Sequence, residues 1–414
     1  MLDLYRLAAQ LPDFSHHRAG ERARAASLLE RALACLESCD GCWEDLRERA
    51  ARADVSWLVA RLRERPAGRH APEPRPTPVT VVATDGSQVF PDRHREPHCY
   101  LLNVSRLAFQ YGTHEAPFIE AVPMLGYEQK LMENLLDEIH HDASDEAISA
   151  RRDELELAAL LDTARSARVE GRPLVAVADG TLIRWMLRAM RDAKQAEGFV
   201  QRYAALLEGF RAERLPLCSY VSLPRNTEVT NLLRIHVGEG DTPGGDTPGG
   251  DTPGGDTPGG DAGGGAMPAD AEASLEGLLD RAIFERTLLP GERSAIFESS
   301  SKIQMKYAPD DRICYFYLHV PGGALGEGGE IARVELPTWV ADDAALVALV
   351  HSVVLSECDK GGGYPMILAE AHERAVIRQR EKDAFFALLD HSLAGPGQPP
   401  MLSRKASSKR TPMG

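Results

Sequence analysis

The chain has 414 residues, which allows two or three domains at the usual ~100–200 residues each. With 43% hydrophobic, 26% charged and 6% aromatic residues, its composition is that of a soluble globular protein and excludes a fibre or a disulfide scaffold. A formal net charge of −15 excludes a surface that is basic throughout, so any nucleic-acid site must be a local patch or be completed by cations or a partner subunit.

The first 70 residues indicate a helical arm. Residues 22–37 and 43–63 are rich in Ala, Leu, Arg and Glu, with apolar positions at helical spacing. The Pro-rich stretch 70–78 cannot continue a helix and serves as a connector. The amino terminus lacks the basic-then-apolar order of a signal peptide, and no apolar run reaches the roughly 18 residues that span a bilayer. We therefore expect a cytoplasmic protein.

The cysteines support a reducing compartment, because they are odd in number and mostly scattered. Cys35, Cys39 and Cys42 have the spacing of an iron–sulfur triplet, but the repeated strand–helix units of a radical-enzyme barrel do not follow them. Inert cysteines are favoured over a zinc or an iron–sulfur site.

After the connector, β-branched runs alternate with helical patterns, which predicts an α/β fold with a sheet flanked by helices. The strands are expected at 79–84, 99–109, 118–123, 174–178, 217–221, 312–320 and 332–336. The helices are expected at 145–168, 199–212, from 228 onward, 342–355 and 366–389.

Two segments differ from this pattern. Residues 237–272 contain four Asp-Thr-Pro-Gly-Gly repeats and eight acidic residues without Lys or Arg, so we expect a disordered insertion. A β-roll metal repeat would need apolar residues in the period. Residues 391–414 carry four basic residues and no acid, and we expect a flexible basic tail.

A repeated motif carries the strongest chemical information. Val-Val-Ala-Thr-Asp85-Gly86-Ser87 and Val-Ala-Val-Ala-Asp179-Gly180-Thr181 are each predicted to be an apolar strand that ends in Asp-Gly-hydroxyl. Such a carboxylate lies at the rim of a sheet, where α/β folds bind ligands, and the glycine permits close approach. A single Asp-Gly is more often an ordinary turn, but two in this setting favour a site.

Between the two motifs lies the acidic helix segment Arg152-Asp153-Glu154-Leu155-Glu156-Leu157. The order strand-Asp, helix-Glu, strand-Asp is similar to that of ribonuclease H-like folds. Clustered carboxylates suit Mg²⁺ or Mn²⁺, and two such ions can stabilise the attacking and leaving oxygens of phosphodiester hydrolysis. A solvated helix face is the competing explanation for each glutamate.

A third element lies near the C-terminus, where Tyr364 precedes a helix that contains His372. A residue just before a helix and one two turns inside it can reach the same rim. Taken alone, His372 would more often be a partly buried helix residue than a ligand. An imidazole in a mixed site favours Mn²⁺ over Mg²⁺.

Together these elements resemble the NurA family of DNA-repair nucleases, over about residues 78–384 apart from the insertion. In that family an Asp-Gly-Ser strand, a helical Glu, a second Asp-Gly strand and a Tyr with a His eight residues later form the active site. The matching positions are Asp85, Glu156, Asp179, Tyr364 and His372. Glu154 is an alternative to Glu156, and a family lysine has two candidates, Lys302 and Lys306.

The resemblance implies a ribonuclease H-like nuclease domain at 78–390, following the arm at 1–70. It implies that Asp85, Glu156 and Asp179 hold Mn²⁺, with Mg²⁺ as a substitute, that His372 is a further ligand or orients the attacking water, and that Tyr364 positions the scissile phosphate. The expected activity is 5′–3′ exonuclease action on single- and double-stranded DNA, with single-strand endonuclease activity.

The same resemblance implies a homodimer that works with a HerA-type hexameric ATPase in processing double-strand breaks. The chain has no phosphate-binding Walker loop, so ATP-driven movement must come from that partner. Two alternatives stay open: a non-catalytic ribonuclease H-like module that docks on a translocase or on DNA ends, which the acidic surface favours, and a related enzyme that acts on RNA.

Overall fold

The computed structural model describes residues 3–8, 10–92, 98–127, 144–188, 190, 192–238, 274–322 and 329–393. The predicted insertion, apart from residues 237 and 238, lies outside the described residues, and so does the predicted tail from residue 394 onward. Within the described ranges, no helix has the length and apolar character needed to cross a membrane.

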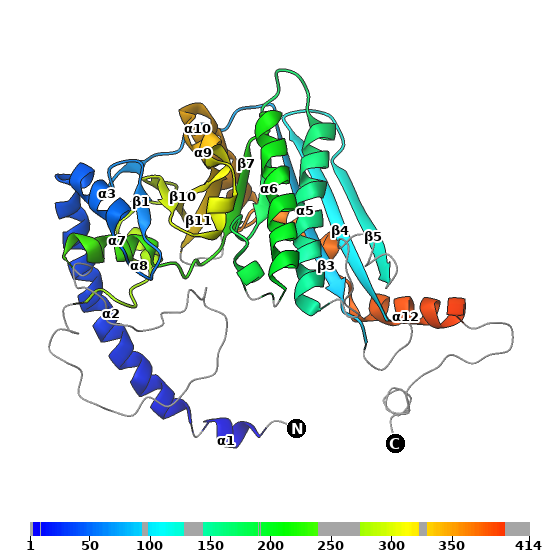
Figure 1. The fold of residues 1–414 in the computed structure, drawn as a ribbon, viewed down its shortest axis with the longest axis horizontal. Helices are drawn as coiled ribbons and strands as arrows, with labels where there is room; N and C mark the ends of the chain where they lie inside the picture. Colours follow the sequence, from blue (N-terminus) through cyan, green and yellow to red (C-terminus); the bar gives the residue numbers. More distant parts are fainter. Residues whose placement is uncertain are drawn as a thin grey trace. The chain divides into compact units, whose positions relative to one another are not determined.

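The chain divides into two compact units (Figure 1). The first unit comprises Met1–Pro72, Val221–Lys302 and Ile313–Glu335, and the second comprises Glu73–Tyr220, Ile303–Arg312 and Leu336–Gly414.

The sheet of the second unit has the strand order β7-β6-β3-β4-β5. Strand β3 pairs antiparallel with β4, β4 pairs antiparallel with β5, and β3, β6 and β7 are parallel. This mixed sheet, flanked by helices, confirms the predicted α/β fold. The strands are β3 (Val79–Val89), β4 (Cys99–Tyr111), β5 (Phe118–Tyr127), β6 (Leu174–Asp179) and β7 (Leu217–Val221).

Helices cover both faces of this sheet. Thr84 in β3 bonds to the backbone of α5, whereas Ser87, which is out of phase with it, bonds to the end of α11. Helix α6 packs on α5 (Figure 1). The helices of this unit are α5 (Asp145–Ala167), α6 (Ala193–Ala212), α9 (Thr338–Ala341), α10 (Ala344–Lys360), α11 (Met366–Ala375) and α12 (Gln379–Leu393), with short 3₁₀ turns at Trp185–Arg188, Ile303–Lys306 and Pro309–Asp311.

The first unit packs helices against its own strands. Its core includes Leu36 and Leu46 of the N-terminal helices, Leu232 of α7, Phe284 of α8 and Phe297 of β9. The helices are α1 (Leu4–Ala8), α2 (Leu11–Asp40), α3 (Trp43–Arg52), α7 (Glu228–His236) and α8 (Asp280–Thr287). The strands are β1 (Ala60–Leu62), β2 (Arg69–His70), β8 (Arg293–Ser294), β9 (Phe297–Ser299), β10 (Ile313–Val320) and β11 (Glu330–Pro337).

Two sequence predictions about helices were wrong. The helix expected at 43–63 ends at Arg52, and Ala60–Leu62 forms strand β1 because it pairs with β9 and buries Ala60 and Leu62. The helix expected at 366–389 is two helices that are separated after Ala375, whose carbonyl accepts hydrogen bonds from the side chains of Ser87 and Asn103.

The prediction that a strand ends just before Asp85 was also wrong. Strand β3 continues to Val89, because its antiparallel ladder with β4 includes Asp85↔Ser105 and Gly86↔Val104. The first Asp-Gly is therefore part of a strand and not a turn. The second conforms to the prediction, since Asp179 ends β6 and Gly180 has a positive φ of 71°.

Candidate active site

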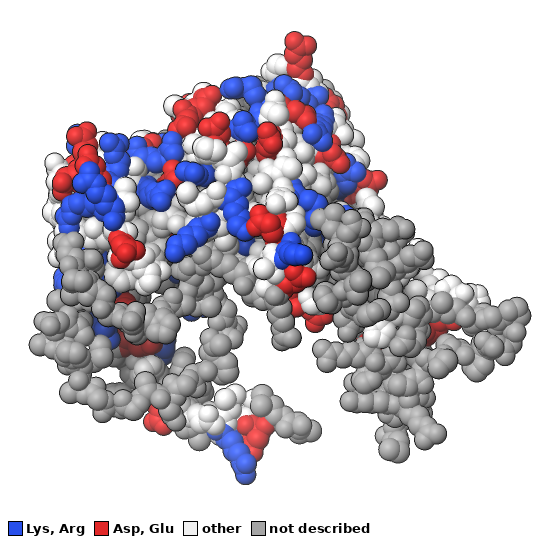
Figure 2. All heavy atoms as spheres, in the orientation of Figure 1, with Lys and Arg blue, Asp and Glu red and all other residues white. Residues whose placement is uncertain are grey.

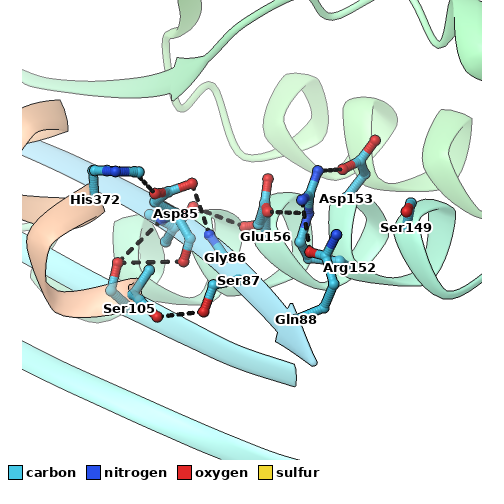
Figure 3. A network of polar contacts seen from close by, with 12 residues as sticks. Asp85, Gly86, Ser87, Gln88, Ser105, Ser149, Arg152, Asp153, Glu156 and His372 are labelled. Atoms are coloured by element: carbon cyan, nitrogen blue, oxygen red, sulfur yellow. Dashed lines mark hydrogen bonds and ion pairs between the residues drawn. The ribbon is translucent and has the colours of Figure 1, made fainter. Parts of the chain in front are cut away.

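Asp85 and His372 form a close pair in the second unit. The Asp85 carboxylate lies 2.9 Å from Nδ1 of His372, and the exposed fractions of the two side chains are 16% and 65% (Figure 3). Oδ1 of Asp85 also accepts the backbone N–H of Gly86 at 2.8 Å. The histidine side chain is therefore open to solvent, while the aspartate is held on the strand.

Gly86 allows a glutamate of α5 to reach the strand. A Cβ at residue 86 would lie 2.5 Å from Oε1 of Glu156 and 2.9 Å from Cγ of Arg152, closer than real Cβ contacts permit. Thr84 fixes the same turn of helix, because its hydroxyl donates to the backbone oxygen of Glu156 at 2.9 Å. The glycine is required here by the approach of Glu156, which comes from the α5 face of the sheet.

Asp179 and Tyr364 form the second pair. The phenol hydroxyl of Tyr364 donates to Oδ1 of Asp179 at 3.0 Å, and its ring packs edge-on against Tyr220, with 5.5 Å between the centroids. The parallel register Ala83↔Val177 places Asp85 and Asp179 two residues further along neighbouring strands. The two aspartates therefore lie at the same level of the sheet.

The electrostatics of the three acids are those of a crowded anionic site. Burial, together with the charges of Asp153 and Asp85, raises the pKa of Glu156 to about 8 against the opposing effect of Arg152. Removal from water raises the pKa of Asp179, the Tyr364 hydrogen bond opposes that rise, and Asp85 adds to it. The charge of Asp85 therefore destabilises the charged forms of both Glu156 and Asp179.

The donor chemistry of this group fits a divalent cation. Three carboxylates are hard oxygen ligands of the kind that Mg²⁺ and Mn²⁺ prefer, and a cation would relieve their mutual repulsion. Among the residues that the structure describes, no three His, Cys, Asp or Glu side chains are already grouped as metal ligands. The fit therefore rests on donor type and repulsion and not on a preformed geometry.

The other sequence candidates lie apart from these contacts. Glu154 is 8% exposed and forms ion pairs with Arg151 and Arg202, at 2.5 and 2.9 Å. Lys306 forms an ion pair with Glu197, and Lys302 is exposed. The pairing of Glu154 with two arginines favours Glu156 as the helical acid of the group.

Sequence reasoning missed the residues that support these acids. Arg152 lies one helical turn before Glu156, with Nε 3.0 Å from its Oε1, and donates to Gln88 at 2.7 Å and to Asp153 at 2.8 Å (Figure 3). The spacing of four residues on one helix could have indicated the Arg152–Glu156 pair. Ser105, whose hydroxyl accepts the backbone N–H of Asp85 at 3.1 Å, could be identified only from the strand register, which the sequence alone does not give.

The outer surface of α5 and α6 is mixed in charge. Lys and Arg lie interspersed with Asp and Glu on the face shown in Figure 2. Arg165 pairs with Asp162 and Glu213, and Arg211 pairs with Asp311. These pairs neutralise one another, so the described part of this face differs from the basic stripe that typifies a DNA-binding surface.

Comparison with known proteins gives a family and a weak structural likeness. A model of the NurA domain matches residues 79–377. No curated protein matches the chain. One similar solved structure is that of LC9-RNase H1, a type 1 RNase H with the type 2 active-site motif; it has 12% identity and a TM-score of 0.19, and the match covers 35% of this chain and 63% of that one. Because the matched range contains all five candidate site residues and most of the chain, the chain belongs to the NurA family, a family of nucleases involved in DNA repair.

Proposed function

We propose that the protein is a Mn²⁺-dependent DNA nuclease, with Mg²⁺ as a possible substitute. Its activity is 5′–3′ exonuclease action on single- and double-stranded DNA, with single-strand endonuclease activity, in the resection of DNA ends. One observation carries the proposal: Asp85 and Asp179 lie at the same level of adjacent parallel strands, and Glu156 of α5 packs against Gly86, the residue after Asp85.

Asp85, Glu156 and Asp179 would hold the metal, with His372 as a further ligand or as the group that orients water. A bound divalent ion supplies an activated water and stabilises charge on the phosphate oxygens. The ~2.9 Å contact of His372 with Asp85 keeps the imidazole at the carboxylate, in position to accept a proton from water. Tyr364 contacts Asp179 and Tyr220, so its phenol lies beside the Asp179 carboxylate and can position a phosphate oxygen.

We further propose that the protein acts as a homodimer with a HerA-type hexameric translocase at double-strand breaks. Family membership supports this assignment. The mixed charge of the α5 and α6 surface agrees with weak, salt-sensitive binding of DNA by the isolated protein and with a need for a partner.

The test is a nuclease assay on linear duplex and single-stranded DNA, labelled at either end, with Mn²⁺ or with a chelator. The wild type should release 5′-terminal products with Mn²⁺ only, and Asp85→Asn should lower the rate at least about a thousandfold. Asp162→Asn, which changes an exposed aspartate of α5 in an ion pair with Arg165, is the matched control and should keep the rate.

Two results would refute the proposal: no degradation of any DNA by the wild type with Mn²⁺, or full activity of Asp85→Asn. Matched RNA oligonucleotides serve as a further arm, and faster cleavage of RNA than of DNA would replace the proposed substrate. Repeating the assay with the translocase shows whether the partner raises the rate.

A further inference from the structure

Three polar side chains from two neighbouring strands hold the end of α11, the helix that carries His372. The Ser105 hydroxyl donates to the carbonyl of Ala371 at 2.8 Å. The Asn103 amide donates to the carbonyl of Ala375 at 2.8 Å, and the Ser87 hydroxyl donates to the same carbonyl at 2.5 Å. The gripped carbonyls therefore lie on both sides of His372 in the sequence.

The strand register explains why these residues act together. In the β3–β4 ladder Asp85 is paired with Ser105, and Ser87 is paired with Asn103. Paired residues of antiparallel strands, and residues two apart on one strand, point to the same face of a sheet. The three polar side chains thus share the face on which Asp85 meets His372.

Ser105 connects the two members of that pair directly. Its side chain is fully buried, and its Oγ accepts the backbone N–H of Asp85 at 3.1 Å while donating to the residue before His372. One hydroxyl therefore fixes the backbone of the aspartate relative to the backbone of the histidine. Figure 3 shows Ser105 beneath Asp85, on the His372 side of the strand.

Two of these side chains, Ser87 and Asn103, bind the C-terminal end of α11, where backbone carbonyls need donors from outside the helix. The last carbonyls of a helix have no partner within it and carry its partial negative charge, so they attract donors. Ser87 and Asn103 satisfy the final carbonyl of α11, at Ala375, and Asn103 also lies 3.3 Å from that of Arg374. The contacts both terminate the helix and fix its position on the sheet.

We propose that Ser87, Asn103 and Ser105 form a polar clamp of positioning residues that sets His372 against Asp85. The predicted effect of the clamp on catalysis rests on the proposed nuclease function. The effect of the clamp on the position of α11 does not depend on that function. Because the clamp acts on the backbone of α11, its loss should affect the chemical step more than the binding of DNA.

The first experiment is amide hydrogen exchange of residues 372–376 in the full chain, without metal. Ser105→Ala should speed exchange there about fivefold, the effect of one lost hydrogen bond, and leave α5 unchanged. Thr163→Val is the matched control, since Thr163 is equally buried and its hydroxyl donates to the Ala159 carbonyl in α5. It should leave exchange in α11 unchanged.

The second experiment measures steady-state kinetics with Mn²⁺ and the affinity for Mn²⁺ by calorimetry. Ser105→Ala should lower kcat about tenfold or more with KM for DNA unchanged, because small misplacements of reacting groups are costly. Ser87→Thr keeps the donated hydroxyl and should retain the wild-type kcat, whereas Ser87→Ala should lower it.

Unchanged exchange in α11, or a kcat for Ser105→Ala equal to that of Thr163→Val, would overturn the clamp while leaving the proposed function in place. If the wild type neither binds Mn²⁺ nor cleaves DNA, the proposed function fails, and the exchange experiment alone decides whether the clamp exists.

Discussion

Each unit of this protein contains a group of neighbouring carboxylates, and the two groups are arranged in opposite ways. In the first unit, Arg333 is 1% exposed and forms ion pairs with Glu228 and Glu335 at 2.9 and 2.8 Å. Asp280 accepts a hydrogen bond from the Tyr317 hydroxyl and two from backbone N–H groups. These acids face cations and donors.

In the second unit, the acids are influenced by other acids. Asp85 raises the pKa of both Glu156 and Asp179 in addition to the effect of burial. The Glu228 carboxyl also has a raised pKa because of its burial, but there the next influence is Arg333, which lowers it. A buried acid whose strongest neighbouring charge is a cation indicates a structural role, whereas acids whose pKa is raised by other acids indicate a functional one.

The largest effect should come from removing the charge of one acid in the second unit. Glu156→Gln should lower the nuclease rate at least about a thousandfold, because the amide is a poor ligand for a divalent cation. Glu154→Gln, two residues away on the same helix, should stay within about threefold of wild type. Assays of both variants on one DNA substrate decide which glutamate serves the site, and the reverse outcome would assign the site to Glu154.

Breaking the ion pairs of Arg333 with Glu228 and Glu335 should lower the stability of the protein and leave its metal binding unchanged. Arg333→Met removes the cation that pairs with two buried carboxylates and should lower the free energy of unfolding by about 3–5 kcal/mol. Arg61→Met removes only a more exposed ion pair with Glu298 and should cost about 0–1 kcal/mol. Urea unfolding measures both, and equal costs would contradict a structural role for the Arg333 network.

Divalent cations should stabilise the protein through the second unit. At a Mn²⁺ concentration of about 100 times Kd, the free energy of unfolding should rise by about 2.7 kcal/mol, because the ion binds only the folded state. Thermal unfolding with and without Mn²⁺ measures the shift. Asp179→Asn should show little of it, and an equal shift in that variant would place the ion elsewhere.

The smallest effect should come from the phenol that bonds to Asp179. Tyr364→Phe keeps the ring against Tyr220 and removes one hydrogen bond to a carboxylate, so kcat should fall about tenfold. Tyr127→Phe, a change at an exposed tyrosine at the end of β5, is the control and should leave kcat as it is. A Tyr364→Phe enzyme with wild-type kcat would remove Tyr364 from the site.

The sequence predicted the elements of the second unit better than their ends or partners. Apolar runs identified β6 and β7 almost to the residue, because parallel strands are buried on both faces. The extent of β3 beyond Thr84 was not predictable, because a ladder with β4 decides it and Asp-Gly is locally a turn signal. Strand β1 was hidden by a helix-favouring composition that its pairing with β9 overrides.

The candidate site divides in the same way. The five candidate residues were predicted by motif. In the structure they form the contacts Asp85–His372 and Tyr364–Asp179, and Glu156 lies beside Gly86. Ser105 could not be found, since a lone serine in a strand has no pattern until the register sets it opposite Asp85. The sequence could not distinguish Glu154 from Glu156 as the site acid, because the residues that tell them apart lie on other elements: Arg202 of α6 pairs with Glu154, and Gly86 of β3 lies beside Glu156.

Calorimetric titration of Mn²⁺ into the wild type and Asp85→Asn tests most directly whether Asp85, Glu156 and Asp179 form a metal site. The account predicts saturable binding to the wild type and at least about tenfold weaker binding to the variant, because one carboxylate ligand is lost. No binding to the wild type, or equal affinity in both, would contradict it and favour a non-catalytic module.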